Sequence, residues 1–140
     1  MRIFLITTIL LLNLNVLFAQ NNEKNTLTLN FEITKYDEGQ ILFALYNSEN
    51  NHMEVTLNTA EVKVENGKAE VMVKNLKSGY YSFSYFHDVD SNGELDSNFM
   101  GIPKEPYGFS NGEKGKLGPP SFEDCKIKIE NDLNIEISIK

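Results

Sequence analysis

The chain has 140 residues, with 20 acidic and 13 basic side chains, and its formal net charge at pH 7 is −7. So acidic a chain is a poor candidate for binding nucleic acid or anionic lipid, because phosphate binding needs clustered Lys and Arg. The one cysteine, Cys125, excludes an internal disulfide framework. We interpret Cys125 as a small, buried apolar residue.

The N-terminus has the order of a secretory signal peptide. A basic start at Arg2 precedes the almost continuously apolar stretch 3–18, and Ala19 then offers a small residue before a polar segment. We therefore predict a signal peptide at 1–19 and export of the remaining chain, 20–140, to the periplasm or the extracellular space. A retained membrane anchor is the alternative. A membrane span needs about 20 apolar residues, and this stretch is shorter. We therefore expect cleavage of the signal peptide, which leaves no membrane span.

The remaining chain is predicted to be all-β. Residues 26–34 alternate between apolar and polar side chains, which is typical of a strand with one buried face. Similar short stretches recur, with turn residues between them. The predicted strands are 26–34, 40–46, 61–65, 68–74, 80–87, 123–130 and 133–139. About seven short strands without a convincing amphipathic helix predict a single antiparallel β-sandwich of immunoglobulin-like or transthyretin-like kind, with a small barrel as the alternative.

The dipeptide Asn66-Gly67 lies between two of these alternating stretches. It is the strongest short-range signal for a β-hairpin, because a type I′ turn needs positive φ at both central residues. We therefore predict that 61–65 and 68–74 pair as a hairpin. The polar segment 47–58, which carries His52, is predicted to be a loop or a short helical turn.

Residues 87–122 form one long loop inserted before the last two strands. This loop holds all four prolines and six of the nine glycines of the chain. Connections of this length in a compact domain are usually functional or disordered, and the many aromatic residues here argue against disorder. We therefore expect the function of the protein to lie in this loop.

The first part of the loop resembles an incomplete EF-hand calcium loop. Residues 88–96 follow the pattern Asp-x-Asp-x-Asn-Gly-x-Leu-Asp, in which alternate side chains converge on the ion and Gly permits a sharp turn. The predicted ligands are Asp88, Asp90, Asn92, the backbone carbonyl of Glu94, and Asp96.

Two departures from the EF-hand predict a weak calcium site on a β-scaffold. Phe99 stands at the twelfth position, where an EF-hand has a bidentate Glu, and a strand instead of a helix enters the loop. Water, Glu105 or residues 123–124 would supply the missing ligands. The alternative is a turn whose Asp and Asn side chains bond only to their own backbone.

The aromatic second part of the loop has two interpretations. Its side chains either pack on one another as a satellite core or form a recognition surface for a still unknown ligand or envelope partner. The candidate surface consists of His87, Glu105, Tyr107 and Phe109. We expect a non-enzymatic binding module. The alternatives are a hydrolase that acts on a sugar or a peptide through His87 and loop carboxylates, and a purely structural envelope module.

Three sequence blocks, in this order, carry a family resemblance. They read His-Asp-x-Asp-x-Asn-Gly-x-Leu-Asp from His87, Gly-Ile-Pro-x-Glu-x-Tyr-Gly-Phe-Ser from Gly101, and Gly-Pro-Pro-Ser-Phe-Glu-Asp from Gly118. With them the chain resembles the DUF2141 family of exported bacterial proteins. Asp90 and Cys125 depart from the Asn and Ala that are usual in that family. The resemblance implies a small exported β-domain and supplies no reaction.

Overall fold

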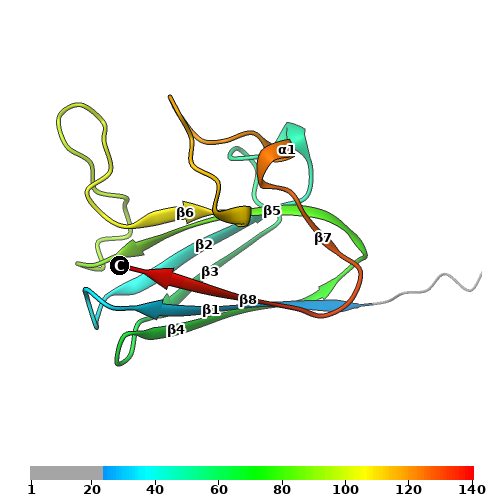
Figure 1. Ribbon diagram of the computed structural model, residues 1–140, viewed down its shortest axis with the longest axis horizontal. Coiled ribbons are helices and arrows are strands. Elements are labelled where there is room, and N and C mark those ends of the chain that lie inside the picture. The colour runs from blue at the N-terminus through cyan, green and yellow to red at the C-terminus, as the bar shows by residue number, and fades with distance from the viewer. Residues whose placement is uncertain (1–23) are drawn as a thin grey trace, which may run out of the picture.

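The computed structural model describes residues 24–140, so the signal peptide predicted at 1–19 lies outside the described residues. Eight strands form two sheets that face each other as the layers of a sandwich (Figure 1). The elements are β1 (Asn25–Ile33), β2 (Gln40–Tyr46), η1 (Glu49–Asn51), β3 (Asn58–Lys63), β4 (Lys68–Leu76), β5 (Gly79–Asp88), β6 (Tyr107–Phe109), η2 (Ser110–Gly112), α1 (Phe122–Cys125), β7 (Ile127–Ile129) and β8 (Leu133–Ile139). The predicted all-β sandwich is therefore confirmed, with β6 as an additional strand inside the long loop.

The first layer has three strands in the order β4-β1-β8. The central strand β1 pairs antiparallel with β4 but parallel with β8. The parallel pair departs from a purely antiparallel sandwich. It can form because almost the whole chain separates the two strands, and parallel neighbours need a long connection.

The second layer has the order β3-β2-β5, and two short strands share the remaining edge of β5. β6 pairs with residues 84–86 of β5, and β7 pairs with residues 79–81. The segment 87–122 is therefore not a bare loop, because β6 returns it to the sheet. β5 lies at the centre of this layer, and its last residue, Asp88, opens the acidic stretch.

The core lies between the two layers, as the alternating pattern predicts. Strand β1 contributes every second side chain, from Leu27 to Ile33, and strand β2 contributes Ile41, Phe43 and Leu45. Each of these side chains is at most 5% exposed. Full burial of one such side chain stabilises the fold by about 1.5–3 kcal/mol.

The turn at Asn66-Gly67 has the predicted geometry, but the predicted hairpin was wrong. The φ angles are 52° at Asn66 and 70° at Gly67, and Glu65 and Lys68 exchange backbone hydrogen bonds of 2.9 and 3.1 Å. Beyond this single bridge the strands separate: β3 pairs with β2, and β4 pairs with β1. Each strand gains a longer ladder with a central strand than it would keep at the turn, so the turn joins the two layers.

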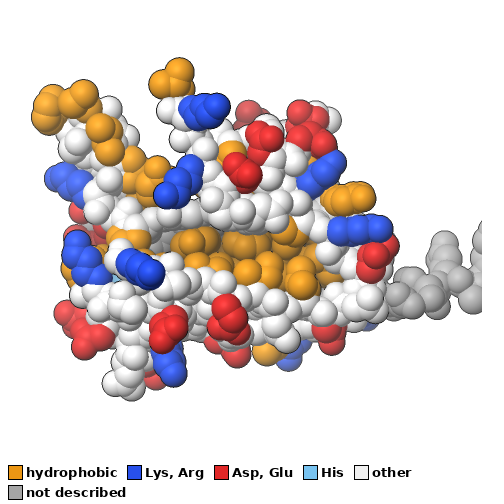
Figure 2. Space-filling view, in the orientation of Figure 1, with side chains coloured by type: hydrophobic (Ala, Val, Ile, Leu, Met, Phe, Trp, Pro, Cys, Tyr) orange, Lys and Arg blue, Asp and Glu red, His pale blue; other side chains and the backbone are white. Residues whose placement is uncertain are grey.

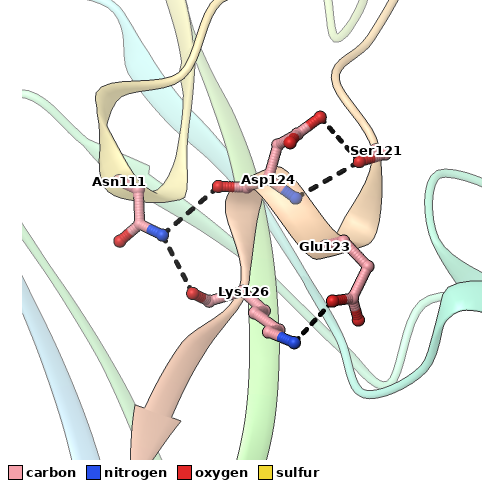
Figure 3. A network of polar contacts seen from close by, with 5 residues as sticks. All are labelled: Asn111, Ser121, Glu123, Asp124 and Lys126. Carbon is pink, nitrogen blue, oxygen red and sulfur yellow. Dashed lines mark hydrogen bonds and ion pairs between the residues drawn. The ribbon is translucent and has the colours of Figure 1, made fainter.

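The strand predicted at 123–130 begins as a helix: α1 ends at Cys125, and the strand β7 starts only at Ile127. Ser121 caps α1, since its Oγ accepts a hydrogen bond from the Asp124 backbone N–H at 3.2 Å. A Ser followed three residues later by an acidic residue is a helix-start signal, and here it outweighs the apolar alternation. The amide of Asn111 in η2 donates to the carbonyls of Asp124 and Lys126, and this network ties η2 to α1 (Figure 3).

We predict that Gly67→Ala destabilises the fold more than Gly112→Ala does. Both glycines have positive φ, which costs a residue with a side chain about 1–2 kcal/mol. A Cβ at Gly67 would also lie 2.6 Å from the backbone oxygen of Ile33, whereas a Cβ at Gly112 would meet nothing within 4 Å. Urea denaturation should give the larger loss of unfolding free energy for Gly67→Ala, and equal losses would contradict this account of the turn.

We also predict that the Cys125 thiol is unreactive in the folded protein. Burial, followed by the negative charges of Glu113 and Asp124, raises its pKa to about 11. The thiol should therefore resist the disulfide reagent DTNB at about pH 8 and react only in urea. Because the unfolded thiol loses its proton near pH 8.5, the stability that this thiol contributes should be full below about pH 8.5 and decline as the pH rises toward 11. Rapid reaction of the native protein would contradict the burial.

Candidate functional site

The site is built on the carboxylate of Asp88, the last residue of β5. This side chain is fully buried, and three donors hold it: Gln40 Nε2 at 2.7 Å, the Gly93 backbone N–H at 2.8 Å and the Asn92 backbone N–H at 3.1 Å. Gln40 stands directly opposite Asp88 in the ladder between β2 and β5. The strand register therefore fixes the first carboxylate of the predicted calcium loop.

The same hydrogen bonds set the charge of Asp88. Burial raises the pKa of this carboxyl group, but the hydrogen bonds from Gln40, Gly93 and Asn92 together lower it by more, so its pKa lies below the usual value. Asp88 is thus ionised at neutral pH although it is removed from water. Within residues 24–140, no Lys or Arg forms an ion pair with it.

We define the acidic loop as residues 88–106. Glu105, near its far end, lies close to Asp88. Its carboxylate is 8% exposed and accepts the backbone N–H groups of Val89 at 2.8 Å and Asp96 at 3.1 Å. Asp88, Asp90 and Glu105 each offer one oxygen atom within 4.8 Å of the others, and this acidic triad could hold a metal ion. The sequence pattern placed Glu105 only among the possible extra ligands.

Asn92 links the other predicted ligand residues, Glu94 and Asp96, to the triad by hydrogen bonds. The side-chain nitrogen of Asn92 donates to Asp90 at 3.2 Å and to Asp96 at 3.3 Å, and its oxygen accepts the Glu94 backbone N–H at 2.7 Å. Gly93 has φ of 83°, as the sharp turn requires. The side-chain-to-backbone bonds of the alternative interpretation are therefore present together with the convergence of carboxylates.

The twelfth position of the calcium pattern supplies no ligand to the triad. Phe99, at the twelfth position of the calcium pattern, is 97% exposed. It lies at a second turn, in which the Asn98 side chain accepts the backbone N–H groups of Met100 and Ile102 at 2.9 and 3.0 Å. Glu123 and Asp124, the other suggested ligands, are engaged around α1 with Lys126 and Ser121 (Figure 3).

The four residues of the candidate binding surface differ in exposure. Tyr107 is 49% exposed and contacts Phe109 edge to face, whereas Phe109 and Glu105 are buried. His87 is fully buried in the sandwich interior, where its Nε2 donates to the Glu38 carbonyl at 2.8 Å. Nδ1 of His87 has no hydrogen-bond partner among residues 24–140. Period-two alternation along β5 could have predicted the burial of His87, because it places His87 on the same face as Phe83 and Tyr85.

We predict that Glu105→Ala loosens the acidic loop. The variant removes the acceptor of two backbone N–H groups, and a hydrogen bond to a charged group contributes about 1.5–3 kcal/mol. Hydrogen exchange measured by NMR should show faster exchange at the Val89 and Asp96 amides. Glu123→Ala, which removes an exposed ion pair with Lys126, is the control and should leave both amides unchanged. Equal protection in both variants would show that Glu105 does not hold the loop.

A comparison with known protein families finds one match. The model of the family described as "Uncharacterized protein conserved in bacteria (DUF2141)" matches residues 30–137, which include the whole acidic loop. No curated protein and no solved structure matches the chain. Because the match spans nearly all of the described residues, the chain belongs to the DUF2141 family.

Proposed function

We propose that this protein is an exported, non-enzymatic β-sandwich module whose acidic loop binds a calcium ion with low affinity. The bound ion would order the loop beside Tyr107 and Phe109. One observation carries the proposal: Asp88, Asp90 and Glu105 present carboxylate oxygens within 4.8 Å of one another. Carboxylates this close repel one another, and a cation between them would relieve the repulsion.

The chemistry of the triad favours calcium among the divalent cations. All of its side-chain ligands are hard oxygen atoms, and calcium accepts six to eight such ligands with loose geometry. Zinc and copper prefer imidazole and thiolate ligands. The neighbouring His87 is turned into the core, and the distant Cys125 is buried. Asp96 and the Glu94 carbonyl are the further ligands that we propose from the sequence pattern.

Low affinity follows from the missing bidentate Glu at the twelfth position. Extracellular calcium modules bind with Kd of about 10⁻⁴–10⁻³ M, which suffices where calcium is abundant. Export is proposed from the order of charge, apolar stretch and small residue at 1–19. Among residues 24–140 no helix has the length and apolarity needed to cross a bilayer.

The burial of His87 weighs against the hydrolase alternative. A general acid or base must come within hydrogen-bond distance of its substrate, and this imidazole is 0% exposed and held by a backbone carbonyl. If calcium does not change the stability of the protein, the purely structural envelope module is the function that remains.

We predict that about 10 mM calcium, which is ten to a hundred times the expected Kd, raises the melting temperature relative to EGTA. At ten to a hundred times Kd, a ligand that binds only the folded state stabilises it by about 1.4–2.7 kcal/mol. For a domain of this size that corresponds to a shift of about 5–11 °C, which differential scanning calorimetry measures. Magnesium should shift the melting temperature less, because it demands near-ideal octahedral geometry. Superimposable curves in calcium and EGTA would refute the proposed function.

We further predict that Asp90→Asn weakens the calcium-dependent shift, because an Asn oxygen can still bind the ion but carries no charge. Asp90 is the exposed member of the triad, so its replacement removes one ligand charge without opening a buried site. Glu70→Gln is the matched control, since Glu70 is an exposed carboxylate on the outer face of β4 in the other layer. Isothermal titration with calcium should show clearly weaker binding to Asp90→Asn than to the control. Equal binding to both variants would place the ion elsewhere.

A further inference from the structure

The outer faces of the two layers differ in chemistry. On the three-stranded sheet, the outward positions of β1 are Thr28, Asn30 and Glu32, and the adjoining outward positions are mostly polar or charged as well. On the second layer, the corresponding positions are largely apolar. They are Leu42, Ala44, Ser84, Phe86, Tyr107 and Phe109. An antiparallel sheet that faces water on one side normally alternates to polar residues there, so the apolar residues of this face predict a covering segment or a ligand.

The strand register joins these residues into a continuous floor. In one row, Leu42 of β2 pairs with Phe86 of β5, which pairs with Tyr107 of β6. In the neighbouring row, Ala44 pairs with Ser84, which pairs with Phe109. Two rows across three strands therefore place five largely apolar side chains and Ser84 side by side.

Two segments turn this floor into a groove. Met53, just after η1, and Leu95, in the acidic loop, line its sides, and the cavity volume is about 540 Å³. Figure 1 shows the acidic loop and the region of η1 and α1 rising over the outer side of β2, β5 and β6, at opposite ends of the sheet. Sites for small molecules in proteins measure about 300–1,000 Å³ and are lined by apolar and aromatic side chains with a few polar groups.

The polar groups of the groove limit what it can hold. Ser84 Oγ lies on the floor, 3.3 Å from the Tyr46 hydroxyl, and Thr59 and Glu61 line the β3 side. Glu61 is the charged side chain of the lining, and the adjoining acidic loop is negative as well. An anion would be repelled here, and the many hydroxyl groups of a sugar would find too few partners.

We propose that this groove binds a small molecule that has an apolar, ring-containing body and carries no negative charge. The rings would lie against Phe86 and Tyr107, and one hydroxyl or amino group would reach Ser84. A second copy of the chain fits less well. The segments at both ends of the sheet stand above the floor and would keep a flat sheet face from reaching it (Figure 1). Figure 2 shows an apolar cluster on the acidic loop, beyond the end of the sheet where β6 begins.

Two fluorescent probes with the same ring system test the proposal. N-phenyl-1-naphthylamine is uncharged, and 8-anilino-1-naphthalenesulfonate is its sulfonated relative. Titration of the folded protein should show saturable fluorescence enhancement with the uncharged probe and at least about tenfold weaker binding of the sulfonate, a difference of about 1.4 kcal/mol. Absence of saturable binding of the uncharged probe, or equal affinity for both probes, would overturn the proposal.

A pair of matched variants locates the probe. Ala44→Phe fills the floor of the groove and should weaken binding of the uncharged probe by about tenfold or more. Thr28→Phe places the same side chain on the outer face of the other central strand and should leave binding unchanged. Tyr107→Ala, at a half-exposed position that tolerates truncation, serves if Ala44→Phe does not fold, and it should weaken binding several-fold. Wild-type affinity in the groove variants would overturn the assignment.

The test separates this proposal from the calcium site. The probe titration and the thermal melt are both run in calcium and in EGTA. Probe binding without an effect of calcium on the melting temperature supports the groove but not the calcium site. An effect of calcium on the melting temperature without probe binding refutes only the groove. Size-exclusion chromatography tests whether a second copy of the chain occupies the groove. A dimer that Ala44→Phe converts to a monomer would show that a second copy fills the groove and would overturn the proposal.

Discussion

The pairing of β2 with β5 is the constraint on which the rest of the molecule depends. Its register sets Gln40 opposite Asp88 and so supplies the donor that lets an ionised carboxylate be buried at the end of a strand. The acidic loop starts from that carboxylate, because the Asn92 and Gly93 backbone N–H groups are bonded to it. A slip of one residue would turn every side chain of β5 to the opposite face and would remove both the site and the core contacts.

The same pairing divides β5 into two functional faces. Tyr81, Phe83 and His87 point into the sandwich, while Ser84, Phe86 and Asp88 belong to the outer face. The proposed cation site and the proposed groove therefore share one face of one strand. Leu95 of the acidic loop lines the groove. An ion that orders this loop would in this way also position one wall of the groove.

Local patterns along the chain predict much of this fold. Strict alternation located β1 and β8 to within a residue, and the Asp-x-Asp-x-Asn-Gly pattern located the start of the site. Strand partners were not predictable, because the Asn66-Gly67 turn has the same local geometry whether its strands stay together or separate into two layers. The local pattern did not identify Glu105 as a member of the triad for a similar reason. Its distance from Asp88 in space depends on the return of β6 to the sheet, and no short-range spacing encodes that return.

The lone pairs of the triad explain how these carboxylates can serve both the loop and an ion. An ionised carboxylate has about four acceptor positions. Asp88 uses three of them on protein donors, whereas Asp90 and Glu105 each use two. The triad thus keeps about five positions free while its oxygens are already held in place, so the proposed ion would need little rearrangement of these three side chains. Five falls short of the six to eight ligands of calcium, and water, Asp96 or the Glu94 carbonyl would have to complete the shell. A site that is held in advance but is incomplete in ligands fits weak binding that responds to calcium in the millimolar range.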